Sequence, residues 1–205
     1  MLFLTSSVTC VAKKLISHLS KPPAEIRLTF IPTASEVKKG DLLWLKKERQ
    51  SLVDAGFQVT DFTVTGKTKA EVTAMLDNTD IVFVSGGNSF YLLQEMRKSG
   101  FANVIHQYVD NGLIYGGSSA GSIVAGPDLT LLAALDATVE APELTDFKGL
   151  GLVDVVVFPH WGSDHFREKY TQRMMDAYKR GQKIILLTDD QYLLVDNGTY
   201  SIQSI

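Results

Sequence analysis

Cysteine is nearly absent from this sequence of 205 residues, and Cys10 is its single representative. One cysteine excludes an internal disulfide, and without a partner Cys10 is expected to be a small, buried hydrophobic side chain. Long apolar runs are also missing, because none approaches the roughly 20 residues that cross a bilayer. The first residues, MLFLTSS, have neither the basic start nor the long apolar stretch of a signal peptide. We therefore expect a cytoplasmic protein without a membrane partner.

An excess of basic charge is lacking as well, because Asp and Glu outnumber Lys and Arg and the net charge is −3. Such a chain offers no basic surface for nucleic acid. Two cofactor loops are excluded by spacing: GGSSAG has the wrong glycine positions for a dinucleotide fingerprint, and GKT lacks the earlier glycine of a phosphate-binding loop. HWGSDH is the one segment that imitates a metal motif, but its first His precedes the helix. Neither a cofactor nor a metal is expected.

The chain does contain a regular alternation of apolar runs and amphipathic runs. The run DIVFVSGG is too apolar for a solvated face, which indicates a parallel strand covered on both sides. The alternation predicts one α/β domain over residues 1–205, with a mostly parallel, helix-covered sheet. The expected strands are 25–35, 57–65, 80–87, 152–161 and a final pair around the DNG turn of 182–202; the expected helices are 40–57, 69–80, 88–100, 101–112 and 163–181. Residues 129–140 fit either type, and the charges at 46–49 are expected on a solvated helix face.

The stretch GLIYGGSSAGSIVAG (112–126) joins two short apolar runs through a cluster of small residues. Its segment GSSAG fits G-x-S-x-G, in which the serine lies on a sharp strand-to-helix turn and the flanking residues must be small. Ser119 is therefore a candidate nucleophile, and the N–H groups of the following turn favour developing negative charge. A plain, tightly packed glycine turn fits the same letters.

A nucleophilic serine needs a base, and the base needs an acceptor that orients it. His160 follows VVVFP at the end of a strand, where the crevice of an open parallel sheet lies, and is favoured over His165 in the next helix. Trp161 is a candidate pocket wall or part of the core. Asp189 and Asp190 follow IILLT, and because adjacent side chains of an extended chain point to opposite sides, one of them can face the imidazole.

Two backbone N–H groups are needed to bind the oxyanion of a tetrahedral intermediate. One belongs to Ala120, directly after the candidate nucleophile. The other is assigned to Gly87 in SGGN, because glycines at a strand end allow the backbone to approach a substrate. Asn88 then fits the N-cap of the next helix. The order Ser, His, Asp differs from the order in α/β-hydrolases, which excludes that fold.

These motifs resemble the S51 serine peptidases, the family of dipeptidase E (aspartyl dipeptidase) and cyanophycinase. VSGGNSFYLL, GLIYGGSSAG, VVVFPHW and LTDDQYLLVDNG come in the family order and span most of the chain from about residue 80. The resemblance implies a three-layer, mostly parallel flavodoxin-like sheet of the class I glutamine amidotransferase type. It also implies Ser119 as nucleophile, His160 as base, and Gly87 with Ala120 as oxyanion donors. Counting back from VDNG, it makes Asp189 the third member of the triad.

The chain departs from the family at three points. Ser118 stands where dipeptidase E often has Trp, and Asp189 stands where the family usually has Glu. The dipeptidases hold an acidic substrate side chain with a basic residue shortly after the His. Arg167 and Lys169 are the candidates here, and a place near the start of a helix would direct Arg167 back toward the crevice.

Three functions fit the sequence. The expected one is a serine exopeptidase, a dipeptidase that favours N-terminal Asp and forms an acyl-enzyme, with Arg167, Asn88 and Trp161 as substrate contacts. The second is a serine hydrolase of the same fold that acts on a β-aspartyl polymer or an ester. The third is a non-catalytic binding module that keeps the turn as scaffolding. The expected partner is a small peptide, and the sequence does not indicate an oligomeric state.

Overall fold

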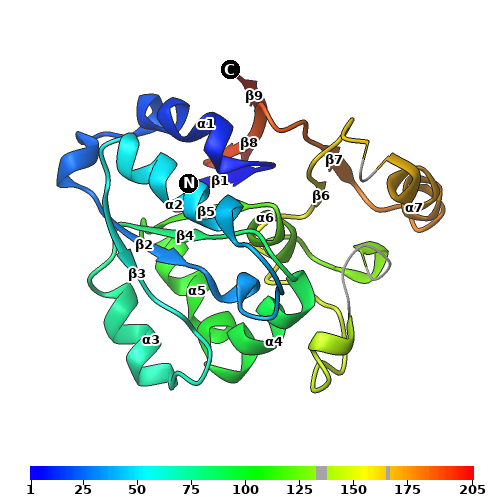
Figure 1. Ribbon diagram of the computed structural model, residues 1–205, viewed down its shortest axis with the longest axis horizontal. Coiled ribbons are helices and arrows are strands. Elements are labelled where there is room, and N and C mark those ends of the chain that lie inside the picture. Colours follow the sequence, from blue (N-terminus) through cyan, green and yellow to red (C-terminus); the bar gives the residue numbers. More distant parts are fainter. Residues whose placement is uncertain (133–137, 165–166) are drawn as a thin grey trace.

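The computed structural model describes residues 1–132, 138–164 and 167–205 (Figure 1). Its strands are β1 (Leu2–Thr5), β2 (Arg27–Ile31), β3 (Gln58–Asp61), β4 (Ile81–Val84), β5 (Ile114–Ser118), β6 (Val156–Phe158), β7 (Ile184–Leu186), β8 (Gln191–Asp196) and β9 (Thr199–Ser204). Its helices are α1 (Val8–Leu15), α2 (Leu43–Asp54), α3 (Lys69–Leu76), α4 (Ser89–Lys98), α5 (Phe101–Asp110), α6 (Ala120–Val124) and α7 (Arg167–Lys179).

The main sheet of the described residues has the strand order β3-β2-β4-β5-β1-β8-β9. The strands from β3 to β1 run parallel, whereas β8 is antiparallel to β1 and β9 is antiparallel to β8. Every residue of β4 is buried, as expected for a strand with helices on both faces. The predicted α/β fold with a mostly parallel, flavodoxin-like sheet is confirmed.

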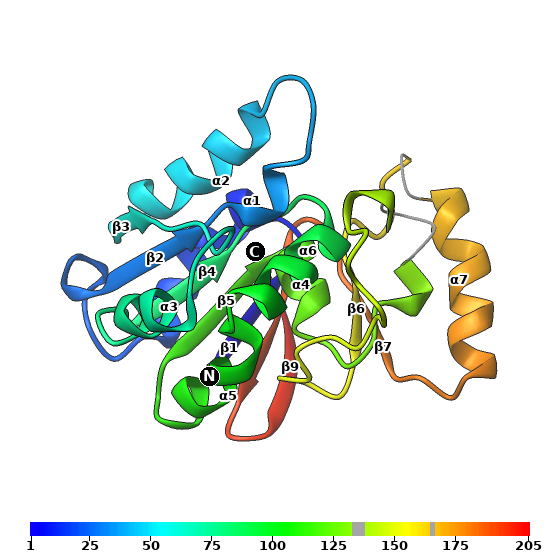
Figure 2. The same ribbon diagram turned by 90° about the horizontal axis from the view of Figure 1, so that it is seen from below.

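One face of the sheet is covered by α1 and α2 (Figure 2). The buried residues of α1 recur at positions 8, 11, 12 and 15, which form one stripe of a helix. This stripe packs together with Leu52 of α2 on Phe3 and Phe30 of the sheet. Cys10 lies outside the stripe and is exposed, so the prediction that it is buried was wrong.

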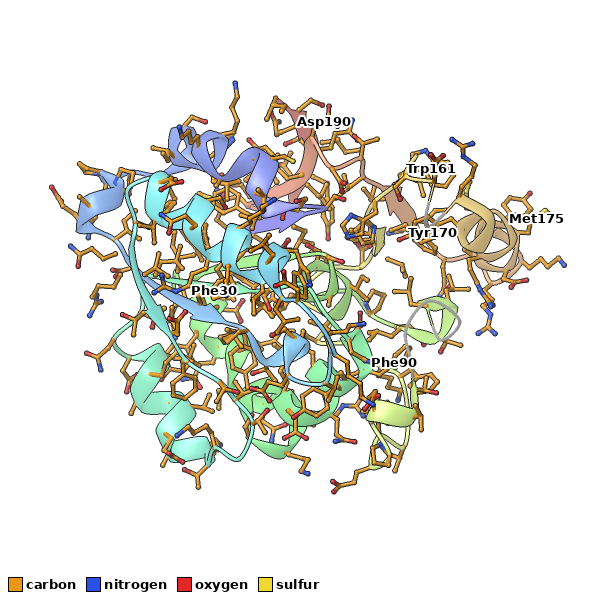
Figure 3. The ribbon with its side chains drawn as sticks, in the orientation of Figure 1. Phe30, Phe90, Trp161, Tyr170, Met175 and Asp190 are labelled. Carbon is orange, nitrogen blue, oxygen red and sulfur yellow. The ribbon has the colours of Figure 1, made fainter. Side chains whose placement is uncertain are left out.

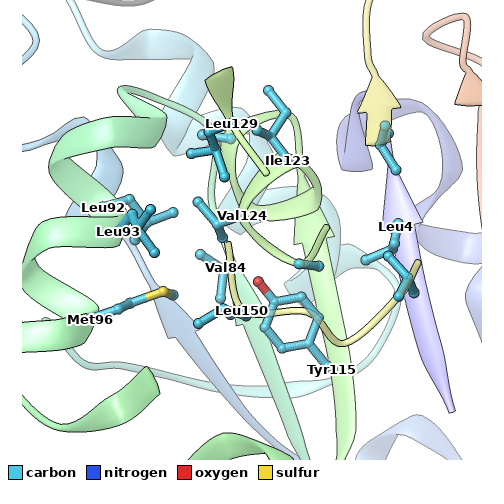
Figure 4. Close-up of a cluster of buried hydrophobic side chains, with 14 of the residues drawn as sticks. Leu4, Val84, Leu92, Leu93, Met96, Tyr115, Ile123, Val124, Leu129 and Leu150 are labelled. Carbon is cyan, nitrogen blue, oxygen red and sulfur yellow. The ribbon is translucent and has the colours of Figure 1, made fainter. Parts of the chain in front are cut away.

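The other face is covered by α3, α4, α5 and α6. Leu92 and Met96 of α4 point toward Val84 of β4 and Val124 of α6, with Tyr115 of β5 beside them (Figure 4). The strands therefore lie between two helical layers, as the three-layer prediction requires.

The C-terminal third departs from the predicted boundaries. β6 and β7 form a separate parallel pair, and α7 lies beside them, away from the main sheet (Figure 1). The strand expected over 152–161 is reduced to three residues, and Pro159, which lacks an N–H for the ladder, follows it directly. The pair nevertheless brings the residues after β6 and β7 to the same edge.

The first 24 residues carry no predicted element, yet they form β1 and α1. β1 lies between β5 and β8, with Leu2–Thr5 paired in register with Tyr115–Ser118. Four residues are too few to show a period, so pairing with distant strands decides this element.

Two predictions near the C-terminus have different outcomes. The DNG turn joins β8 to β9, and Asn197 (φ 46°) and Gly198 (φ 76°) have the two positive φ angles of a tight hairpin. The ambiguous stretch 129–140 forms 3₁₀ turns at Thr130–Leu132 and Thr138–Glu140, and residues 133–137 lie outside the described residues. Among the helices that the structure describes, none has the length and apolar character needed to cross a membrane.

Candidate active site

A cavity of about 620 Å³ lies beside the carboxyl ends of β1, β4 and β5. Its lining residues come from the start of α1, from the segment leading into α2, and from the loops after β4, β5 and β6: Ser7, Thr9, Cys10, Lys38, Lys39, Leu42, Trp44, Lys47, Glu48, Gly86, Gly87, Ser119 and His160. A second cavity, of about 440 Å³, lies near the amino ends of β4 and β5 and contains none of the predicted site residues. Three of the predicted site residues, Gly87, Ser119 and His160, therefore line the first cavity.

The turn that carries Ser119 is as cramped as the motif requires. A Cβ on Gly117 would lie 2.5 Å from the carbonyl carbon of Gly121, and a Cβ on Gly121 would lie 2.2 Å from the carbonyl oxygen of Val84. Strand and helix backbones thus meet at a distance that leaves no room for a side chain. Ser119 itself has φ 47° and ψ −106°, a conformation that L residues rarely adopt and that marks functional sites.

Hydrogen bonds to β1 hold this turn in place. The Ser119 N–H donates to the Thr5 carbonyl at 3.1 Å, and the Ser122 hydroxyl donates to the same carbonyl at 2.8 Å. The Tyr115 hydroxyl donates to the Gly121 carbonyl at 2.7 Å. The turn is therefore anchored to the strand that the sequence patterns did not reveal.

Ser119, His160 and Asp189 form one chain of hydrogen bonds. His160 Nδ1 lies 2.7 Å from Asp189 Oδ1, and His160 Nε2 lies 3.0 Å from Ser119 Oγ. An ionised carboxylate can only accept, so Nδ1 carries the proton and donates to Asp189. The lone pair of Nε2 is then left to accept the hydroxyl proton of Ser119, which is the arrangement a general base requires.

Asp189, not Asp190, faces the imidazole. Asp190 accepts a hydrogen bond from the Thr188 hydroxyl. The hydrogen bond from His160 is the main reason that the pKa of Asp189 lies below its ordinary value, and a hydrogen bond from Ser6 adds to the effect against partial burial. Asp189 is therefore held in its ionised form.

Ser6 is a supporting residue that the sequence analysis missed. Its hydroxyl donates to Asp189 Oδ1 at 2.7 Å and accepts the N–H of His160, also at 2.7 Å. One buried hydroxyl thus connects the loops after β1, β6 and β7. No local pattern could have identified it, because Ser6 and Asp189 are 183 positions apart.

The two predicted oxyanion donors lie on adjacent loops at the cavity. Ala120 is the first residue of α6, so its N–H has no carbonyl partner within the helix. Gly87 has φ 140°, and a Cβ there would lie 2.1 Å from the Ala34 carbonyl oxygen. The close approach of these two backbone segments therefore excludes any residue other than glycine at position 87. Both residues adjoin the wall that contains Ser119 and His160.

Asn88 has the capping role predicted for it. Its Oδ1 accepts the N–H groups of Phe90 and Tyr91 at 2.9 and 3.0 Å, and its side chain is 1% exposed. This carboxamide is therefore buried at the start of α4, and the substrate contact expected of Asn88 stays a prediction.

Trp161 and Arg167 also lie apart from the cavity lining in the described part of the chain. Trp161 is half-buried, with its ring centroid 6.2 Å from that of Tyr170 (Figure 3). Arg167 pairs with Asp164 at 3.0 Å on an exposed part of α7. His165 and the side chain of Lys169 lie outside the described residues. The cations that do line the cavity come instead from residues 38–47.

Glu48 corrects another expectation. The charges at 46–49 were expected to face solvent, yet the Glu48 side chain is 6% exposed. It follows Leu45 by three positions and precedes the buried Leu52 by four, so it lies on the inward stripe of α2. That spacing could have identified it from the sequence.

The carboxylate of Glu48 contacts both glycine-rich loops. Ser118 Oγ donates to its Oε1 at 2.5 Å, and the Gly86 N–H donates to its Oε2 at 3.2 Å. Burial raises the pKa of Glu48, while these two hydrogen bonds and the nearby His160 act in the opposite direction. An ionisable group of this kind in a cavity is typical of a functional site.

The fold and this cavity define an α/β protein with a strained serine at the carboxyl edge of a mostly parallel sheet. The chain belongs to Peptidase family S51, whose model matches residues 2–203, and it is a peptidase. An uncharacterized peptidase of Pasteurella multocida is 34% identical over 86% of this chain and 84% of its own length. Peptidase E of Streptomyces coelicolor is 33% identical over 85% of this chain and 70% of its own length.

Solved structures agree with this family membership. A crystal structure of a Listeria monocytogenes protein assigned as a peptidase E has a TM-score of 0.91 and 27% identity, and the match covers 100% of this chain and 98% of that one. The crystal structure of a peptidase from an acI-B1 actinobacterium has a TM-score of 0.71 at 18% identity, and the match covers 100% of this chain and 87% of the actinobacterial chain. At this identity the similarity concerns the fold alone.

Proposed function

We propose that this protein is a serine exopeptidase that cleaves short peptides through an acyl-enzyme, with Ser119 as nucleophile, His160 as base and Asp189 as the group that orients the base. The observation that carries the proposal is the continuous chain from Asp189 through His160 to Ser119, with contacts of 2.7 and 3.0 Å. These contacts lie within the range in which a proton can pass from a hydroxyl to an imidazole.

The reaction follows from the positions of these groups. Ser119 Oγ attacks the carbonyl carbon of the substrate while its proton moves to His160 Nε2, and Asp189 stabilises the imidazolium. The N–H groups of Gly87 and Ala120 bind the oxyanion. His160 then gives the proton to the leaving amine as the C–N bond breaks. A water molecule, activated by the neutral imidazole, hydrolyses the ester and restores Ser119.

We also propose a preference for an N-terminal Asp. It rests on the family resemblance and on the basic side chains in the cavity wall, where Lys39 and Lys47 are exposed. A lysine ammonium near the cavity attracts a substrate carboxylate. Arg167, the cation first expected to do this, pairs with Asp164 and is no part of this wall.

The test combines a fluorophosphonate probe with a panel of Asp-X, Asn-X and Ala-X dipeptides. The wild type is expected to be labelled at Ser119 and to cleave Asp-X fastest. Ser119→Ala is expected to remain folded and to lose about 10⁶-fold in kcat. Labelling without dipeptide cleavage would favour an ester or a β-aspartyl polymer as substrate. A wild type that neither reacts nor cleaves would support the non-catalytic binding module and refute the proposal.

A further inference from the structure

Glu48 is a buried carboxylate in the wall of the cavity, and the reaction proposed above does not use it. Its two oxygens accept hydrogen bonds from Ser118 and from the Gly86 N–H, and both donors are neutral. Within the ranges that the structure describes, no lysine, arginine or histidine nitrogen lies within the 4.0 Å of an ion pair with Glu48. A buried charge normally requires a partner of opposite sign.

The space above Gly86 connects this carboxylate with the candidate nucleophile. An atom at the position that a Cβ of Gly86 would occupy lies 3.4 Å from Ser119 Cβ, 3.5 Å from Glu48 Oε1 and 3.5 Å from Cζ3 of the Trp44 ring. Only a bonded Cβ can occupy this point, because it lies one covalent bond from the Gly86 Cα, so a substrate atom would lie further out in the cavity that Gly86, Glu48, Trp44 and Ser119 all line. A carboxylate and an aromatic ring together form a favourable environment for a small cation.

We infer that Glu48 binds the α-ammonium group of the substrate's N-terminal residue in this space, so that a free N-terminus is required for cleavage. The inference rests on the proposed function. It assigns an anionic anchor to the cavity, beside the lysines that face a substrate carboxylate. The hydrogen bonds from Ser118 Oγ and from the Gly86 N–H then hold the Glu48 carboxylate in position.

Covalent geometry fixes which peptide bond such an anchor presents. The α-nitrogen of an amino acid lies about 2.5 Å from its own carbonyl carbon, and a reacting pair approaches to about 3–3.5 Å. An ammonium bound by Glu48 lies in the same cavity wall as Ser119, so the first carbonyl of the peptide is the one nearest to the nucleophile. The second carbonyl lies about 3.8 Å further along the chain, one Cα spacing away. The anchor thus selects cleavage after the first residue.

The experiment compares a cleaved dipeptide from the panel with its N-acetyl derivative. Acetylation removes the positive charge and adds bulk, so the wild type is expected to favour the free amine strongly. Glu48→Gln keeps the size of the side chain and groups for both hydrogen bonds but removes the charge. It is expected to lower the ratio of kcat/KM for free over acetylated substrate by about 10- to 100-fold, mainly through KM. Glu25→Gln, an exposed change far from the cavity, is expected to leave the ratio unchanged.

Gly86→Ala tests the same space without touching the carboxylate. Its methyl group makes only ordinary contacts, at 3.4–3.5 Å, so we expect the variant to fold. The methyl group projects into the space that the ammonium group would enter, and the same ratio is expected to fall. This variant keeps the inference testable if Glu48→Gln does not fold, which thermal unfolding measures.

Fluorophosphonate labelling separates this inference from the proposed function, because the probe carries no ammonium group. Absence of labelling in the wild type refutes the proposed function. A labelled wild type with an unchanged ratio in both variants refutes the role of Glu48. Equal losses for both substrates and for labelling in Glu48→Gln would mean that Glu48 only supports the turn, which also overturns the inference. A labelled wild type that turns over neither form counts against it as well.

Discussion

Ser119 has φ 47° and ψ −106°, so replacing it by glycine and by alanine should separate the chemistry of the turn from its strain. Both variants remove the hydroxyl that contacts His160, and they differ only in the Cβ. A conformation of this kind costs a residue with a Cβ about 1–3 kcal/mol. The greater freedom of glycine in the unfolded chain offsets about 0.4–1 kcal/mol of that. Ser119→Gly should therefore be more stable than Ser119→Ala by roughly 1.3 kcal/mol, the difference between the midpoints of these two ranges.

The sign of this difference is diagnostic, because glycine is about 0.5–1 kcal/mol less stable than alanine at ordinary helix or strand positions. For a chain of this length, each kcal/mol shifts Tm by about 2–4 °C. Thermal and urea unfolding of the two variants measure the difference, and both should lack peptidase activity. Ser118→Ala and Ser118→Gly form the control pair, since Ser118 lies in β5, and the usual order is expected there. If Ser119→Ala were as stable as Ser119→Gly, the strain argument would be refuted.

The remaining predictions concern the supports of the site. Asp189→Asn should lower kcat by about 10⁴-fold, because the wrong imidazole tautomer then faces the nucleophile, whereas Asp190→Asn should stay near wild type; equal small effects would remove both from the mechanism. Because the pKa of Asp189 is lowered in the folded protein, its carboxylate stabilises the fold at pH values above the ordinary pKa of 3.8, and this contribution is lost as the pH falls below that value. The free energies of unfolding of wild type and Asp189→Asn in urea should therefore converge in acid and differ near neutrality. Gly121→Ala should destabilise the protein by about 1–3 kcal/mol, because its Cβ would lie 2.2 Å from a carbonyl oxygen of β4; normal urea unfolding would contradict the packing argument. Arg167→Ala should change the ratio of Asp-X to Asn-X cleavage less than Lys47→Ala does, since Lys47 lines the cavity and Arg167 does not; the reverse order would restore the assignment of Arg167 as the substrate contact.

The local sequence was sufficient to predict the structure wherever steric constraints within a few residues determine the backbone conformation. The GSSAG turn follows from the absence of space for side chains at 117 and 121, and the apolar run of β4 indicates a strand covered on both faces. The positive φ angles of Asn197 and Gly198 follow from the two-residue hairpin. In each case the physical cause lies within a few residues of the pattern, so the sequence alone predicts it.

Only the tertiary structure decided the features that depend on distant segments. It placed the four residues of β1 in the sheet, and through Ser6 it connected His160 with Asp189. The spacing of Glu48 to Leu45 and Leu52 was enough to indicate an inward position, but only the fold brought Glu48 against Ser118, 70 positions away. These contacts join loops after different strands, and their partners are selected by the packing of the sheet and its helices. The sequence by itself determined the sharp turn and the α/β alternation, whereas the tertiary packing determined which acid meets the imidazole and which carboxylate lines the cavity.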